Sequence, residues 1–182
     1  MARYAKAILF TWLLSAQGAL AASSASVDFS AQISDGSCEL TLSDTTLNFG
    51  VHLRSKVQDA STVMMLPLTA AIRCSGATSP SLTVTGTPYI MAALSRPVVF
   101  RDADSAASGV GFMVRRDTGG ISQSNFYSMD SALANGEPVT LNAIGEATWQ
   151  NESFLLGLVR AGSLPVTPGT VKAILTFTVT YE

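Results

Sequence analysis

The stretch GTVKAILTFTVTYE, at residues 169–182, constrains the fold of this chain more than any other. Every second residue in it is apolar, and threonines and a lysine fill most of the positions between. Such alternation, rich in β-branched and aromatic residues, is typical of a β-strand with one buried face. A strand has hydrogen-bonding groups along both edges, and no later sequence supplies a neighbour here, so we expect one edge to need a partner from elsewhere. The apolar positions are Val171, Ala173, Leu175, Phe177, Val179 and Tyr181.

These residues carry a resemblance to a known family. Gly169, the alternating apolar positions and the penultimate Tyr181 resemble the C-terminal motif of chaperone–usher pilus (fimbrial) subunits of the type 1-like pilin family. The resemblance implies an all-β fold, an incomplete immunoglobulin-like sandwich of six strands that leaves an apolar groove beside its last strand. It also implies that a periplasmic chaperone first fills the groove and anchors the free C-terminal carboxylate of Glu182. The N-terminal extension of the next subunit fills the groove afterwards.

A second alternation lies within residues 22–36, and Asp35-Gly36 after it is typical of a hinge. By the same resemblance, this segment is the donor strand that fills a neighbour's groove. Ala25 stands where many pilins carry glycine. The alternative is that the segment is an ordinary first strand of its own domain. Its apolar positions are Ala25, Val27, Phe29, Ala31 and Ile33.

Residues 1–21 have the features of a secretory signal peptide. Arg3 and Lys6 flank the start of an apolar run, AILFTWLL, and Ala19-Leu20-Ala21 forms a small-x-small cleavage site. The run is much shorter than the roughly 20 residues that a membrane span requires. We therefore expect a signal at 1–21, a donor extension at 22–36 and a pilin domain at 37–182. The mature protein would pass through the periplasm to an extracellular fimbrium on the bacterial surface.

Cys38 and Cys74 are the only two cysteines. Cys38 continues an apolar alternation with Leu40 and Leu42, and Cys74 continues one with Ile72, so both sulfurs are expected to face the core. In an oxidising compartment the pair should form one disulfide, which stabilises the fold by about 4 kcal/mol on the chain-entropy account. Two thiols and a lone histidine are too few ligands for a metal site.

The body of the chain consists of short apolar runs separated by Gly, Pro, Ser and Asp turns, without a convincing amphipathic helix. This pattern favours a single β-sandwich domain. Pro67 indicates an edge or bulged position within its strand. The run at 154–160 is apolar on both parities, which indicates a central strand covered on both faces. The expected strands are 39–42, 46–49, 63–74, 82–85, 98–101, 108–114, 139–141, 154–160 and 171–181.

The sequence contains no recognisable catalytic set. A hydrolase needs a nucleophile, a base and an orienting group, and the single histidine, His52, lies in a segment expected to be an exposed loop. Asp102 and Asp104 lack the further oxygen ligands of a calcium loop. A formal net charge of −2 without a basic stripe argues against nucleic acid as a partner. We expect no enzyme activity, no cofactor and no metal.

Two functions remain open. The first is a structural subunit of an adhesive fimbria, assembled by donor-strand complementation and exchange and contributing to cell adhesion. Its partners would be the periplasmic chaperone, an outer-membrane usher, neighbouring subunits and a host receptor of unknown identity. The second is a carbohydrate-binding adhesive module of a fimbria, in which Trp149 and Tyr127 stack on a sugar. We favour a core or interface role for these two aromatic residues.

Overall fold

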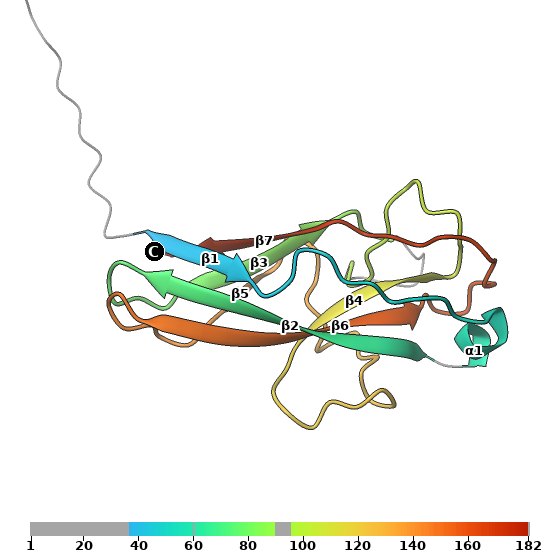
Figure 1. Cartoon of the computed structure of the whole chain (residues 1–182), viewed down its shortest axis with the longest axis horizontal. Coiled ribbons are helices and arrows are strands. Elements are labelled where there is room, and N and C mark those ends of the chain that lie inside the picture. Colours follow the sequence, from blue (N-terminus) through green and yellow to red (C-terminus); the bar gives the residue numbers. More distant parts are fainter. Residues whose placement is uncertain (1–36, 60, 90–95, 182) are drawn as a thin grey trace, which may run out of the picture. The chain divides into compact units, whose positions relative to one another are not determined.

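The computed structural model describes residues 37–59, 61–89 and 96–181. Within these ranges two antiparallel sheets pack face to face (Figure 1). The larger sheet has the strand order β1-β2-β6-β4 and the smaller has the order β5-β3-β7. The elements are β1 (Cys38–Leu42), α1 (Arg54–Asp59), β2 (Thr62–Cys74), β3 (Ser81–Gly86), β4 (Val110–Arg116), β5 (Pro138–Thr140), β6 (Trp149–Arg160) and β7 (Leu175–Thr180).

This architecture confirms the expected all-β sandwich. The described residues contain seven strands rather than six, because the three residues of β5 add a short edge strand to the smaller sheet. The one helix in these ranges, α1, has six residues, which is too short to show an amphipathic period in the sequence.

β2 and β6 form the centre of the larger sheet. Leu68 of β2 lies opposite Phe154 of β6, and both side chains are buried in the space between the sheets. Burial of a side chain of this size contributes about 1.5–3 kcal/mol. Pro67 lies beyond Ala70, the last β2 residue that pairs with β1, so its missing N–H interrupts no bond to β1. The expected edge position of this proline is therefore confirmed.

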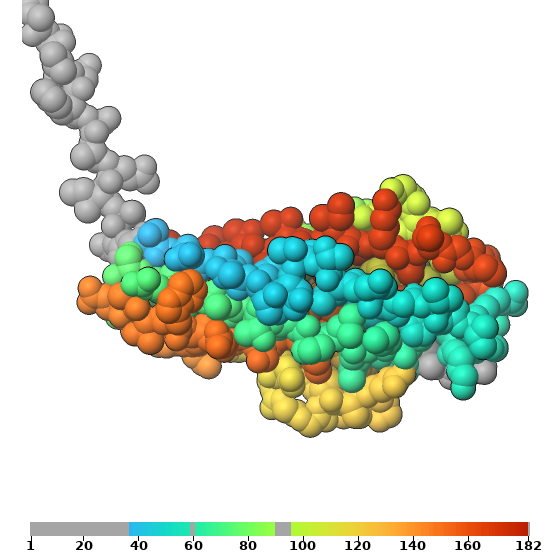
Figure 2. All heavy atoms as spheres, viewed as in Figure 1, coloured from blue at the N-terminus to red at the C-terminus, as the bar shows by residue number. Residues whose placement is uncertain are grey.

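β6 is covered on both faces, as expected. Phe154, on its inner face, lies in the core between the sheets. On its outer face, Val159 lies in a second buried cluster with Phe126, Ala132 and other residues of the connection between β4 and β5. Figures 1 and 2 show this connection, in yellow, as a lobe beside the larger sheet. The lobe closes a face that would otherwise expose apolar residues to solvent.

Three expected strands are absent or shorter than predicted. Residues 46–49 form no strand, and within 98–101 only Phe100 forms bridges, to Pro88 and Phe112. The last strand begins at Leu175, because residues 170–174 hydrogen-bond to the loop at 102–107 instead of to a strand. Alternation reports which side chains face the core, but a strand also needs a partner backbone, which alternation does not reveal.

Candidate functional site: the seam between the first and last strands

β1 and β7 lie at edges of the two sheets and contact each other across the sandwich. The predicted Cys38–Cys74 disulfide is present and joins β1 to β2, where the two cysteines lie directly opposite each other. In Figure 2 the segment after Cys38, in blue and cyan, runs alongside the C-terminal segment, in red. This edge of the sandwich is therefore built from segments at opposite ends of the described chain.

Half-buried apolar side chains follow both segments, and we name this strip the β1–β7 seam. Each side chain packs against the buried core yet remains partly exposed. The ring of Phe177 meets that of Phe154 edge-on at 5.9 Å between centroids, and Phe49 lies tilted against Phe112 at 5.0 Å. A row of half-buried apolar side chains along the edge of a sandwich makes the seam a candidate interaction site. The seam consists of Leu40, Leu42, Leu47, Phe49, Val171, Ala173, Leu175, Phe177 and Val179.

The backbone of the C-terminal segment is bonded along one edge. The carbonyl of Lys172 accepts a hydrogen bond from the Asp102 N–H at 2.8 Å, and Leu175 to Thr180 pair with β3. Even-numbered residues make the bonds to the 102–107 loop, and successive residues of an extended chain direct their backbone groups to opposite edges. Odd-numbered residues 171–179 therefore direct N–H and C=O groups to the second edge. No strand among the described residues pairs with that edge.

The odd-numbered residues thus carry two unmet requirements. Their side chains are only half buried, and their backbone groups point to an edge that no strand of the described ranges pairs with. Both requirements are met by one added strand, because a strand supplies apolar side chains and a hydrogen-bonding ladder at the same time.

The other predicted site residues are distributed as follows. Gly169 packs against the backbone of Ala106 and Ala107, outside the seam, and Tyr181 is half-buried just beyond β7. Glu182, the candidate donor positions 25–33 and the signal segment lie outside the described residues. Sequence reasoning missed the β1 side of the seam, although the shared parity of Leu47 and Phe49 was a signal for it.

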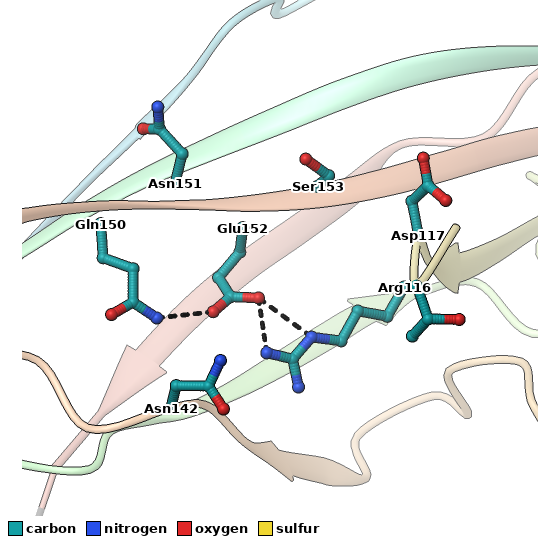
Figure 3. A pocket seen from close by; sticks show the side chains of 8 residues that line it. Arg116, Asp117, Asn142, Gln150, Asn151, Glu152 and Ser153 are labelled. Atoms are coloured by element: carbon teal, nitrogen blue, oxygen red, sulfur yellow. Dashed lines mark hydrogen bonds and ion pairs between the residues drawn. The ribbon is translucent and has the colours of Figure 1, made fainter.

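A polar hollow of about 520 Å³ lies where β4 and β6 meet the segment after β5 (Figure 3). Arg116 donates from Nε and Nη2 to one carboxylate oxygen of Glu152, at 2.9 and 2.6 Å, and Gln150 donates to the other at 2.8 Å. The Glu152 side chain is only 6% exposed. The residues that line the hollow are Arg116, Asp117, Thr118, Asn142, Gln150, Asn151, Glu152 and Ser153.

The position of this ion pair follows from strand parity. Glu152 lies opposite Ala70, and Gln150 lies opposite Ile72, both of which are buried in the core. The two polar side chains therefore point between the sheets, where Arg116 reaches them from β4. Both carboxylate oxygens are already hydrogen-bonded within the protein, so we assign the cluster a structural role.

A second hollow of about 500 Å³ borders β3, the 102–104 loop and the C-terminal segment. Lys172 and Asp104 form an exposed ion pair at its rim. A hydrogen bond from the Lys172 ammonium, together with its charge, lowers the pKa of Asp104, and Asp104 raises the pKa of Lys172 in the same way. The pair fastens the loop to the C-terminal segment.

The aromatic residues considered for sugar binding do not form one surface. Trp149 is 47% exposed at the start of β6, with the Arg73 guanidinium 5.9 Å from its ring centroid. Tyr127 follows Phe126, which packs on Gly157, eight residues further along β6, or about 26 Å at the rise of an extended strand. The two rings therefore cannot stack on the same sugar.

His52 differs from the prediction of an exposed loop residue. It is half-buried, and its Nε2 lies 2.6 Å from the carbonyl oxygen of Phe49, a contact that ties this turn to the seam. In the described ranges, no three His, Cys, Asp or Glu side chains gather where they could hold a metal ion. The helix within those ranges falls short of the length and apolarity needed to cross a membrane.

Several solved structures share this fold, and three of them are pilus or fimbrial proteins. One comes from a chaperone–usher pilus studied for the uncoiling of its rod, at 15% identity and a TM-score of 0.57 over 88% of this chain and 97% of that chain. The P pilus rod subunit PapA is 14% identical, with a TM-score of 0.54 over 80% of this chain and 99% of that chain. An antigen and type I fimbria protein of Burkholderia pseudomallei is 15% identical, with a TM-score of 0.51 over 80% of this chain and 99% of that chain.

A sequence comparison with curated proteins found no match. The family described as Fimbrial protein, in contrast, matches residues 27–182. This match covers most of the chain, including all of the described residues, and it agrees with the motif in the last residues. The protein is a member of the fimbrial protein family.

Proposed function

We propose that this protein is a structural subunit of a chaperone–usher fimbria and that its β1–β7 seam receives a strand donated by a neighbouring subunit. The observation that carries the proposal is the coincidence, on residues 171–179, of half-buried apolar side chains and a backbone edge without a strand partner in the part of the chain that the structure describes. Strand addition at a sheet edge obtains affinity from main-chain hydrogen bonds and specificity from alternate side chains.

Residues 25–33 are the proposed donor. Their five alternating apolar residues equal in number and spacing the five odd-numbered seam residues at 171–179. Every strand pairing among the described residues is antiparallel, so a donor that continues the pattern runs antiparallel to β7. In that direction Phe29, at the centre of the donor, meets Leu175, at the centre of the seam segment. Burial of Phe29 contributes about 1.5–3 kcal/mol, which offsets part of the cost of ordering the segment.

The seam also needs a partner before assembly. An apolar strip beside a free strand edge promotes aggregation, so a newly exported subunit requires temporary cover. In the proposal a periplasmic chaperone supplies that cover, pairs with β7 and holds the Glu182 carboxylate. An outer-membrane usher then brings the next subunit, whose donor replaces the chaperone. The assembled fimbria lies on the bacterial surface and contributes to cell adhesion.

The decisive test is Phe29→Asp, expressed with the subunit's own chaperone and usher. A carboxylate at the centre of the donor cannot enter an apolar seam without a large desolvation cost. We expect the variant to co-purify with the chaperone normally and to be absent from pili. Electron microscopy measures the pili, and gels of unheated samples in detergent show whether subunit polymers form that boiling separates. Ser30→Asp places the same charge on the opposite face of the donor and should leave polymerisation intact. Normal polymerisation of Phe29→Asp contradicts the proposal.

A further inference from the structure

We infer that successive subunits also touch body to body, with the α1 end of one copy against the disulfide end of the next. This inference rests on the proposed strand donation and identifies a second contact that the donated strand does not provide. We define the α1 end by Val51, Leu53, Leu164 and helix α1. We define the disulfide end by Cys38, Glu39, Glu146 and Trp149.

The α1 end exposes apolar side chains. Val51 is fully exposed and Leu53 is 70% exposed, in the segment that leads from the seam into α1. Leu164 is 40% exposed in the loop after β6. The end of β6 lies beside α1, because Arg160 donates a hydrogen bond to the Gln58 carbonyl at 2.9 Å. Figure 1 shows α1 and the loop after β6 at the same end of the described body.

The opposite end also carries an exposed aromatic residue. Trp149 begins β6 opposite Arg73, which is the neighbour of Cys74, and nearly half of its surface is open to solvent. Trp and Arg are enriched among residues that dominate binding energy at protein interfaces. Here the Arg73 guanidinium lies over the Trp149 ring, so the pair presents a broad, partly apolar surface.

The direction of the donor brings these two ends together. β7 runs toward the disulfide end, since Thr180 pairs with Ser81, a few residues after Cys74. A donor antiparallel to β7 therefore runs toward the α1 end of the receiving subunit and leaves the seam there. Only residues 34–37 separate Ile33, the last apolar donor position, from Cys38. The five steps from Ile33 to Cys38 reach at most about 18 Å, so the disulfide end of the donating body is held close to the α1 end of the receiver.

The exposed charges of the two ends favour this contact. Arg54 and Lys56 are exposed on α1, and at the disulfide end the carboxylates of Glu39 and Glu146 outnumber the one exposed cation, Arg73, which lies over Trp149. Apolar surface faces apolar surface, with Leu53 and Val51 on one copy and Trp149 on the next. Because the two ends differ, the contact is heterologous and repeats along a polymer without closing. The occupant of each end is therefore another copy of this chain.

Cysteine cross-linking tests the contact in intact pili. The probe variant combines Leu53→Cys with Glu146→Cys, and the control combines Leu53→Cys with Ser124→Cys, an exposed residue on the lobe between β4 and β5. Pili sheared from cells are oxidised, boiled in detergent and run without reductant. We expect a covalent ladder from the probe pair, in which the thiols meet across the junction, and no ladder from the control pair.

The outcomes separate this inference from the proposed function. Polymers of the probe variant that give no ladder, or equal ladders from both pairs, overturn the contact and leave strand donation standing. Polymerisation of Phe29→Asp overturns strand donation instead. If the cysteine variants do not assemble, exchanging the charges at the contact tests it instead. Lys56→Glu should shorten the persistence length of the pili in micrographs, and the double variant Lys56→Glu/Glu146→Lys should restore it. Unchanged stiffness in Lys56→Glu pili also overturns the contact.

Discussion

Gly169 lies so close to Ala107 that a Cβ at residue 169 would come within 2.6 Å of the Ala107 backbone nitrogen. Its φ of 149° belongs to a region that side-chain-bearing residues rarely adopt. This approach lets the adjacent Thr170 carbonyl accept the N–H groups of both Ala106 and Ala107, at 2.8 and 2.9 Å. The glycine therefore fixes where the C-terminal segment starts along its bonded edge.

The first prediction concerns this glycine. Gly169→Ala should lower the free energy of unfolding by at least about 2 kcal/mol, because backbone strain adds to a clash with the Ala106–Ala107 backbone. The shift in the denaturant midpoint of the purified subunit measures the effect. Gly119→Ala is the control: its φ is also positive, at 82°, but nothing lies within 4 Å of the added Cβ. Equal losses in the two variants would show that backbone conformation alone is responsible.

The second prediction concerns the lobe over β6. A Cβ at Gly157 would come within 2.1 Å of the Phe126 ring, so Gly157→Ala should displace the lobe and cost about 1–3 kcal/mol. Gly145→Ala, whose Cβ has its closest neighbour at 3.4 Å, should cost much less. Adding Phe126→Leu to Gly157→Ala should recover part of the stability, as a double-mutant cycle would measure. Strict additivity of the two changes would contradict the contact.

The third prediction concerns the ion pair in Figure 3. Arg116→Met removes the donor of two hydrogen bonds and leaves the buried carboxylate of Glu152 without its ionic partner, with only the hydrogen bond from Gln150. We expect a loss of about 2–4 kcal/mol in thermal or denaturant unfolding. The double variant Arg116→Met/Glu152→Leu should lose less, because it leaves no buried charge unpaired. A double variant less stable than Arg116→Met would argue against this view.

The fourth prediction is a pH dependence. Lys172 lowers the pKa of Asp104, so the stability from this carboxylate is present above the ordinary carboxyl pKa and is lost as the pH falls through the lowered value. The raised pKa of Lys172 means that its contribution disappears only as the pH rises through that raised value. The difference in denaturant midpoint between the native protein and Lys172→Met should therefore vanish at strongly acidic pH.

High salt should also reduce that difference, because both side chains are more than half exposed and are screened by the solvent. The expected difference at neutral pH is small. A midpoint difference that stays constant from acidic to neutral pH would show that Lys172 acts through packing and not through its charge.

The fifth prediction compares two neighbouring residues of β7. Leu175 points into the seam and Thr176 points to solvent. Leu175→Asp should reduce the amount of subunit that co-purifies with its chaperone by tenfold or more, since a charge in the seam costs well over the ~1.4 kcal/mol that corresponds to a tenfold change. Thr176→Asp should have little effect on capture. Similar recovery of the two variants would place the chaperone contact elsewhere.

Much of this fold follows from local alternation. The parities of Leu68, Ala70 and Ile72 predicted which face of β2 is buried, and the apolar run at 154–160 predicted a strand covered on both sides. The disulfide followed from two cysteines at core-facing positions. Each inference depended on neighbours in sequence, which is the information that a period of two contains.

Other features depend on residues far apart in the chain. The lobe covers β6 because Phe126 finds a glycine at position 157, and neither residue alone indicates the pairing. Gln150 and Glu152 lie at alternate positions of β6 on the same face as the buried Phe154. Polar residues at these core-facing positions indicate a buried polar network. Their partner Arg116 comes from another strand, β4, and alternation within one strand carries no information about the distance to another. Half of the seam was likewise missed, because Leu47 and Phe49 face the core without belonging to a strand.

The disulfide has a mechanical consequence for a fibre built by strand donation. Tension along such a fibre reaches each body through its N-terminal extension, which joins the folded part at Cys38. Cys38 is bonded to Cys74, so the pull passes at once to β2, which pairs with β6 along nearly its whole length. The force therefore bypasses the five-residue ladder of β1, which would otherwise unzip one bond at a time under load.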